Sequence, residues 1–346
     1  MKSINSKKSK PIELRRVTTS EARVIRSFLD TQDPWVAAGS ARIPFPRFVE
    51  TLRNLKSDGF LKDHKGKIRL TGRGLSLAER LRLRSSKQIM DSARSAKRLF
   101  KTLVASRPKS VGDYDQGYMT TDSLFERLTF MALLGDLDGK RICVLGDDDL
   151  ASLAMCLMAS PEQITVFEID KRLVDFINQR ARKNRFPIRC YHWDLRFPIP
   201  ARFNSKFDTF LTDPSETIDG LKMFVGRGLA VLKPKEGCAG YFGLTMIEAS
   251  AAKWAKFEKW LLNKYKIAIT DVLPNKAYYE NWGDLIQQTA CYGEPGFMRK
   301  PRNHWFNSAL IRIETIDGFK PKPIGKIKGA IFNDDEACGL IGKEIK

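Results

Sequence analysis

Histidine and cysteine are scarce in this chain, and their scarcity limits metal and disulfide chemistry. The 346 residues include three histidines and six scattered cysteines, with no Cys-x-x-Cys pair. A structural zinc site needs four such ligands at short spacings, and a secreted disulfide scaffold needs clustered cysteines. We therefore expect reduced thiols, a cytoplasmic location and no bound metal.

Long apolar runs are also missing. No stretch approaches the roughly 20 apolar residues that a membrane-spanning helix requires. The first eight residues, MKSINSKK, lack the apolar core of a signal peptide. We therefore expect neither membrane association nor secretion. The hydrophobic fraction of 42% is that of an ordinary globular protein.

Basic residues outnumber acidic ones, but only in one part of the chain. The formal net charge is +20, from 60 Lys and Arg against 40 Asp and Glu. Residues 1–110 hold 27 basic and 9 acidic residues, whereas residues 111–346 hold 33 and 31. This asymmetry indicates a basic N-terminal part, a candidate for nucleic-acid binding, joined to a nearly neutral larger part.

The N-terminal part has the order of elements of a winged-helix domain. Ser20 is expected to cap a first helix, and a loop around Pro34 leads to a second helix. A short basic hairpin turning at Lys65-Gly66 follows, and Thr71 caps the last helix. Such domains bind DNA or RNA, yet they also serve as dimerisation or lid modules. The sequence leaves these alternatives open.

From residue 139 the sequence alternates apolar strands with helical segments. The strands are expected at 141–145, 163–168, 187–192, 207–212, 237–244, 267–272 and 307–314. Strand and helix in alternation predict an α/β fold, a methyltransferase-like (Rossmann-like) doubly wound parallel sheet. Ligands of such sheets bind at the carboxyl ends of the strands.

Five segments follow from these patterns. They are a basic flexible tail (1–16), a winged-helix domain (17–85), a helical linker (86–110), a Rossmann-like domain (111–317) and a flexible C-terminal tail (318–346). The last segment is either an active-site flap or simply disordered.

Acidic residues follow three of the predicted strands. Glu168 and Asp170 end the second strand, where an acid commonly receives ribose hydroxyls. Asp194 follows the third strand, where an acid can accept the amino group of adenine. Asp213 follows the fourth, beside the place where chemistry occurs. This order is typical of folds that bind S-adenosylmethionine or its relatives.

The loop after the first strand is unusual, because it reads Gly146-Asp147-Asp148-Asp149 where such folds carry several glycines. A helix N-terminus normally attracts anions, and three aspartates there would repel a phosphate. They would attract a cation, such as a sulfonium or a polyamine. One of them is free to cap the helix, but capping does not explain all three.

The turn after the fourth strand reads Asp213-Pro214-Ser215-Glu216. Amino-directed nucleic-acid methyltransferases place an aromatic ring near this position to stack on a flipped base. Glu216 stands there instead, which favours a flexible cationic amine. The alternative is a simple turn followed by a first-turn acid. Upstream, Tyr114, Asp115 and Gln116 are rich in hydrogen-bonding groups and are expected to close over the cofactor corner or to form a capped loop.

Together these motifs resemble the branched-chain polyamine synthase family, the N(4)-bis(aminopropyl)spermidine synthases. The resemblance rests on the winged-helix start, the Tyr114-Asp115-Gln116 segment, the loop from Gly146 to Asp149, and the Asp213-Pro214 turn. It implies transfer of aminopropyl groups from decarboxylated S-adenosylmethionine to the central nitrogen of spermidine. It also implies that Asp147, Asp148 and Asp149 face the amine. The sequence departs from the family where Ser215 replaces a second proline.

Aminopropyl transfer suits these residues chemically. The attacking amine must lose a proton, although free amines have pKa values near roughly 10. We expect Asp148 or Asp149 to accept that proton and Asp213 to orient the amine. Asp147, Glu216, Tyr114, Asp115 and Gln116 are then expected to bind the polyamine, and Gly146, Glu168, Asp170 and Asp194 the donor.

The sequence leaves two other functions open. One is an S-adenosylmethionine-dependent N-methyltransferase acting on RNA or DNA, delivered by the basic N-terminal part. The other is a DNA-binding regulator whose sheet domain senses a nucleoside or polyamine. The sequence also leaves open a homodimer.

Overall fold

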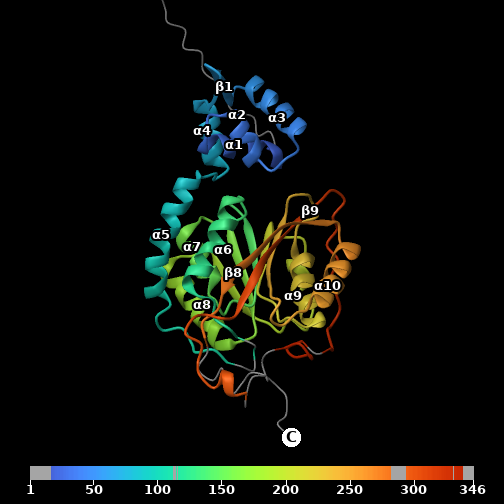
Figure 1. Cartoon of the computed structure of the whole chain (residues 1–346). Helices are drawn as coiled ribbons and strands as arrows, with labels where there is room; N and C mark the ends of the chain where they lie inside the picture. Colours follow the sequence, from blue (N-terminus) through green and yellow to red (C-terminus); the bar gives the residue numbers. More distant parts are fainter. Residues whose placement is uncertain (1–16, 112–113, 115, 282–293, 330, 338–346) are drawn as a thin grey trace, which may run out of the picture. The chain divides into compact units, whose positions relative to one another are not determined.

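The computed structural model of the chain describes residues 17–111, 114, 116–281, 294–329 and 331–337. It divides into two compact units, residues 1–85 and 86–346. None of the helices in these described ranges is long and apolar enough to cross a membrane. Figure 1 shows the elements of both units in sequence colours.

In its described residues, 17–85, the N-terminal unit contains four helices and a hairpin. Its elements are α1 (Thr19–Asp30), α2 (Pro34–Ser40), α3 (Phe45–Ser57), β1 (Leu61–His64), β2 (Lys67–Leu70) and α4 (Gly72–Arg80). The predicted hairpin turn and the Thr71 cap are both present. Apolar side chains of every element, such as Val24, Phe48 and Leu77, form one core. The assignment of this unit as a winged helix stays a prediction.

Two local predictions for this unit were wrong. Ser20 does not cap α1. Thr18, two residues before it, is the N-cap and forms a reciprocal capping box with Glu21. The segment around Pro34 is the helix α2 instead of a loop. Asp33 caps it, and Pro34 occupies the first helical position, where its missing N–H costs nothing.

In the described part of the second unit, a seven-stranded sheet has helices on both faces (Figure 1). Its strands are β3 (Arg141–Leu145), β4 (Gln163–Glu168), β5 (Ile188–His192), β6 (Thr209–Thr212), β7 (Ala239–Leu244), β8 (Ile267–Tyr278) and β9 (Asn307–Thr315). Its helices are α5 (Ser86–Leu103), α6 (Thr121–Leu133), α7 (Ala151–Met158), α8 (Lys171–Asn184), α9 (Ile218–Val231) and α10 (Ala251–Lys264).

The strand order is β5-β4-β3-β6-β7-β9-β8. The first five strands of this order are parallel, as predicted, but β9 runs antiparallel to both of its neighbours. Strand β8 is also longer than predicted, extending to Tyr278 through two irregularities in its pairing. The chain therefore reaches Tyr279 at the edge of the sheet where the parallel strands end.

Successive side chains along the strands point to opposite faces of the sheet and pack into two hydrophobic cores. Ile142 and Val144 of β3 face one cluster, which also includes side chains of α5 to α8. Cys143 and Leu145 face the other, which includes α9 and α10. This period of two is the expected signature of a strand buried on both faces. The segment predicted as a helical linker contributes four side chains of α5 to the first cluster: Ile89, Ala93, Ala96 and Phe100.

Candidate active site

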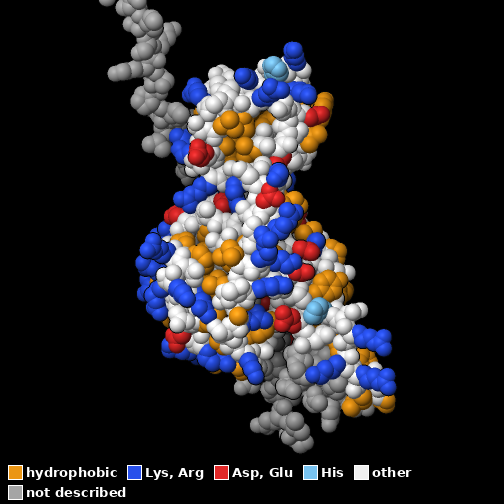
Figure 2. All heavy atoms as spheres, turned by 90° about the vertical axis from the view of Figure 1, so that its left-hand side faces the viewer, with side chains coloured by type: hydrophobic (Ala, Val, Ile, Leu, Met, Phe, Trp, Pro, Cys, Tyr) orange, Lys and Arg blue, Asp and Glu red, His pale blue; other side chains and the backbone are white. Residues whose placement is uncertain are grey.

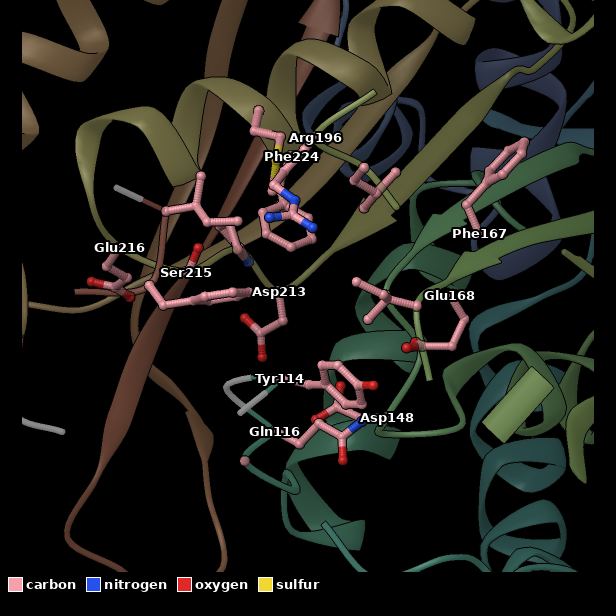
Figure 3. A pocket seen from close by; sticks show the side chains of 18 of the residues that line it. Tyr114, Gln116, Asp148, Phe167, Glu168, Arg196, Asp213, Ser215, Glu216 and Phe224 are labelled. Carbon is pink, nitrogen blue, oxygen red and sulfur yellow. The ribbon is translucent and has the colours of Figure 1, made fainter. Parts of the chain in front are cut away.

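A cavity of about 340 Å³ lies at the carboxyl ends of β3, β4 and β6. Of the site residues predicted from the sequence, those lining it are Tyr114, Gln116, Gly146, Asp148, Glu168, Asp194, Asp213 and Glu216. Asp147, Asp149 and Asp170 are not part of its lining. Asp115 lies outside the described residues. Figure 3 shows Asp213 between Glu216 on one side and Asp148 with Glu168 on the other.

Local backbone geometry explains why the three consecutive aspartates diverge. Gly146 takes a left-handed conformation at φ +72°, and Leu150 follows with φ +58° immediately before α7. Asp147 then turns back into the protein, where its carboxylate accepts hydrogen bonds from the backbone N–H (3.2 Å) and the hydroxyl of Ser152. Asp147 therefore fixes the first turn of α7, the capping alternative raised by the sequence.

Asp148 is the member of this loop that faces the cavity. No residue in the described part of the chain donates a hydrogen bond to its carboxylate. Burial raises its pKa well above the ordinary aspartate value, and the charges of Asp149, Glu168, Asp213 and Asp147 raise it further. A carboxylate with a raised pKa at a cavity wall is suited to accept a proton.

Asp149 lies beneath the cavity. It is 6% exposed, accepts a 2.6 Å hydrogen bond from the backbone N–H of Met119, and faces the guanidinium of Arg127 at 4.0 Å. Burial raises its pKa to about 6, although Arg127 opposes that shift. Through these two contacts, Asp149 connects the loop from Gly146 to Asp149 with α6 and with the segment before α6.

Asp213 is held by groups that the sequence did not indicate. Its Oδ2 accepts a hydrogen bond from the Tyr279 hydroxyl, and Arg127 approaches the same oxygen at 3.5 Å. The hydroxyls of Tyr279 and Ser308 lie 3.2 Å apart. These contacts fix the orientation of Asp213 at the end of β6.

Gly243 of β7 leaves room for Asp213, because a Cβ atom there would collide with Asp213 Oδ1. We expect Gly243→Ala to displace the carboxylate and lower kcat by about 100-fold, because a shift of about 1 Å in the geometry of a site can cost that factor. Steady-state kinetics beside thermal denaturation measures this. Gly39→Ala, at a site with no atom within 4 Å, is the matched control and should be unchanged. Normal turnover in Gly243→Ala would mean that the position of Asp213 is unimportant.

Glu216 and Glu248 form an acidic pair at the far end of the cavity lining. Glu216 Oε1 accepts a 2.8 Å hydrogen bond from the backbone N–H of Thr245, whereas Oε2 is buried and has no partner among the described residues. Burial and the nearby Glu248 raise the pKa of Glu216 well above its ordinary value. A buried, unpartnered carboxylate oxygen beside a second acid is an arrangement suited to an ammonium group.

The opposite end of the cavity combines acids with aromatic rings. Glu168 accepts 2.8 Å hydrogen bonds from the backbone N–H groups of Asp147 and Asp170, which hold its carboxylate at the end of β4. The rings lining this region include Phe167, Trp193 and Phe224. The indole N–H of Trp193 is buried without a partner among the described residues. A flat apolar wall beside a fixed carboxylate fits a nucleoside.

The other residues predicted to bind the donor substrate form ion pairs and hydrogen bonds with neighbouring side chains. Asp194 pairs with Arg196 at 2.6 Å, and both line the cavity. Asp170 caps α8, pairs with Arg172 and accepts a 3.2 Å hydrogen bond from the Gln116 side chain. Gln116 also accepts from the backbone N–H of Val111, so it joins the segment before α6 to α8.

The segment predicted as a flexible C-terminal tail contributes to the cavity. Ile331 and Phe332 line it, and the Ile331 carbonyl accepts a hydrogen bond from Thr217. Farther along, Lys253 pairs with Asp334 at 2.8 Å. Whether this segment moves during the reaction stays a prediction.

Arg127, Tyr279 and Glu248 were not predicted from the sequence. Glu248 follows β7 and was accessible by the rule that identified the other strand-end acids. Arg127 shares a helical face with the buried Leu124, Leu128 and Met131, so a lone charge on an apolar stripe was an available signal. Tyr279 had no such signal, because its place depends on the unpredicted extension of β8.

Comparisons with known proteins match the chain over most of its length. The family model described as branched-chain polyamine synthase A C-terminal domain matches residues 95–338. The N(4)-bis(aminopropyl)spermidine synthase of Thermococcus kodakarensis is 34% identical, over 90% of this chain and 92% of that protein. The Thermus thermophilus protein of the same name is 37% identical, over 85% and 86%.

A solved structure is similar as well. The branched-chain polyamine synthase from Thermus thermophilus, in complex with N4-aminopropylspermidine and 5'-methylthioadenosine, superposes with a TM-score of 0.67. It is 33% identical, and the match covers 93% of each chain.

Proposed function

Because the chain belongs to the branched-chain polyamine synthase family, we propose that its acid-lined cavity is the site of aminopropyl transfer. The enzyme is an aminopropyltransferase that uses decarboxylated S-adenosylmethionine and produces branched polyamines. The observation that supports the location most strongly is the set of carboxylates, Asp148, Asp213 and Glu216, facing one cavity. Phosphate-binding folds carry glycines where this chain carries Asp148.

The cavity fits the two substrates at its two ends. The rings around Trp193, with Glu168 held for ribose hydroxyls, suit the nucleoside of the donor. Its aminopropyl arm would then extend towards Asp148 and Asp213. Glu216 and Glu248 would bind an ammonium group of the polyamine acceptor beyond the reacting nitrogen.

The transfer step is a displacement at carbon. The acceptor nitrogen attacks the aminopropyl carbon beside the sulfonium, a C–N bond forms, and the C–S pair of electrons returns to sulfur. Methylthioadenosine leaves as a neutral thioether. Asp148 would take the proton released from nitrogen, while Asp213, fixed by Tyr279 and Arg127, orients the amine.

Donor choice tests this function. With decarboxylated S-adenosylmethionine and spermidine, we expect methylthioadenosine to accumulate with consumption of the polyamine, measured by chromatography. With S-adenosylmethionine and RNA or DNA, we expect no methylated product. Methyl transfer to nucleic acid would establish the alternative methyltransferase, and no turnover with either donor would favour a regulator.

We propose nucleic acid as a second partner, bound through the N-terminal unit. Basic residues outnumber acidic ones by 14 to 7 in residues 17–85, and Lys62, Lys65 and Lys67 on the β1–β2 hairpin are exposed. A further seven basic residues and one acid lie in residues 86–110, on and after α5. Figure 2 shows Lys and Arg side chains on the surface of each of the two units.

The salt dependence of DNA binding tests this proposal. The full chain should bind duplex DNA with an affinity that falls steeply as salt increases, because each phosphate contact releases counterions. Replacing Lys62, Lys65 and Lys67 with Glu should reduce the salt slope by about 3 and leave aminopropyl transfer unchanged. Unaltered DNA binding would contradict a hairpin interface.

A homodimer and a cytoplasmic location also stay predictions. Light scattering tests the first, and cell fractionation tests the second.

A further inference from the structure

Arg127 is a buried cation beneath the acid-lined cavity. Its side chain comes from α6 and is 3% exposed. Nη1 lies 4.0 Å from Asp149 Oδ2, and Nη2 lies 3.5 Å from Asp213 Oδ2. Its Nε has no hydrogen-bond partner among the described residues. One guanidinium therefore faces two carboxylates that come from different strand ends.

This placement is costly unless the charges compensate each other. An ionised group removed from water loses its hydration, and a buried cation is retained only where partners replace that water. Burial acts to lower the pKa of Arg127, but the charges of Asp213, Tyr279 and Asp149 outweigh burial and raise it. Arg127 is thus a permanent positive charge among acids.

The charged groups that act on Arg127 are Asp213 after β6, Tyr279 after β8 and Asp149 before α7. Further acids at this corner are Asp147 and Asp148 before α7, Glu168 at the end of β4 and Glu216 before α9, whose charges act on one another and on Asp149 and Asp213. Tyr279 contributes its hydroxyl after β8, and Arg107 acts on Asp149 as a second cation. Acids outnumber cations here, so Arg127 influences the protonation of the cluster through Asp149 and Asp213.

We propose that Arg127 is a positioning residue of the transfer reaction, which balances Asp149 and Asp213 so that Asp148 remains ionised to take the proton of the attacking amine. The proposal rests on the proposed function of the cavity. Arg127 does not reach the cavity lining itself, so it acts through the carboxylates that it contacts.

Removal of this cation changes the pH dependence in a defined direction. Arg127 lowers the pKa of Asp149, which burial holds at about 6. Without Arg127 the interacting pair of Asp148 and Asp149 retains a proton to higher pH. The acid limb of kcat/KM should therefore move upward. Arg127→Met is expected to shift that limb by at least about one pH unit, and Arg127→Lys, which keeps the charge, by much less.

The experiment measures kcat/KM for the acceptor from low to high pH in the wild type and both variants. Methylthioadenosine binding by calorimetry checks that each variant is folded. A limb that stays in place in Arg127→Met, with activity lowered equally at every pH, would overturn the proposal and leave a structural role. Failure of the wild type to transfer aminopropyl groups would instead refute the proposed function.

Arg127→Met carries a risk, because it leaves buried carboxylates without their cation and can prevent folding. The double variant Arg127→Met with Asp149→Asn removes one charge of each sign and keeps an acceptor for the Met119 N–H. Its acid limb should return close to that of the wild type. A limb still shifted upward by a unit or more in the double variant would overturn the proposal.

Discussion

Asp148→Asn is expected to reduce kcat by about 1,000-fold while the protein stays folded and binds methylthioadenosine. General-base catalysis by a positioned side chain contributes roughly 100-fold to 10,000-fold, and an amide cannot take the proton. Asp148 faces the cavity and makes no hydrogen bond to described residues that an asparagine would break. Single-turnover formation of methylthioadenosine measures the chemical step, separately from product release.

Two matched variants make this result interpretable. Asp175→Asn changes an exposed residue paired with Lys171 on α8, and it should leave kcat unchanged. Asp149→Asn retains an acceptor for the Met119 N–H but loses the charge that faces Arg127, so we expect a smaller loss than for Asp148→Asn. If Asp149→Asn were the more damaging change, the proton acceptor would be Asp149.

Glu216→Gln should raise KM for the polyamine acceptor by about 30-fold and leave KM for the donor unchanged. Loss of one partner of a buried charge pair costs about 2 kcal/mol or more, which corresponds to that factor. The glutamine keeps an acceptor for the Thr245 N–H, so the local structure should persist. The change therefore removes charge while preserving shape.

Proton release gives a second readout of the same residue. The pKa of Glu216 is raised by burial and by Glu248, and an ammonium bound beside it would lower that pKa. Binding of the polyamine should therefore release protons, seen as a dependence of the calorimetric enthalpy on the buffer. Glu216→Gln should reduce this dependence, and the exposed Glu236→Gln should leave it unchanged. If KM for the donor rose instead, Glu216 would belong to the donor subsite, and its assignment to the polyamine acceptor would be wrong.

The sequence was sufficient to predict the strand-helix order and most of the acids around the cavity. Both follow from local rules, because buried strands are short apolar runs and parallel strands end at one edge of a sheet. Asp148, Asp213 and Glu216 were identified in this way, and the structure places all three on the cavity. Their catalytic and binding assignments stay predictions until the variants are measured.

What the sequence did not indicate depends on contacts between distant segments. The three aspartates between Gly146 and Leu150 point in different directions because the backbone is left-handed at both of those residues. This conformation turns Asp147 towards Ser152. Tyr279 reaches Asp213 because β8 extends past its predicted end and pairs with a reversed β9. No spacing in the chain encodes either arrangement.

The structure also changes what the net charge of +20 describes. The basic residues of 86–110 belong to the second unit, on and after α5, so the basic surface is not confined to the N-terminal unit. Several acids of the same unit, among them Asp148, Asp213 and Glu216, meet at the cavity. One unit thus combines a basic exterior helix with an acidic interior site.

The position of the new bond in the product shows whether the enzyme makes branched polyamines. The purified enzyme would convert spermidine and decarboxylated S-adenosylmethionine, and NMR spectroscopy of the isolated polyamine would identify the substituted nitrogen. We expect an aminopropyl group on the central nitrogen, which gives a branched polyamine. A linear product extended at a terminal amine, or a methylated one, would contradict it.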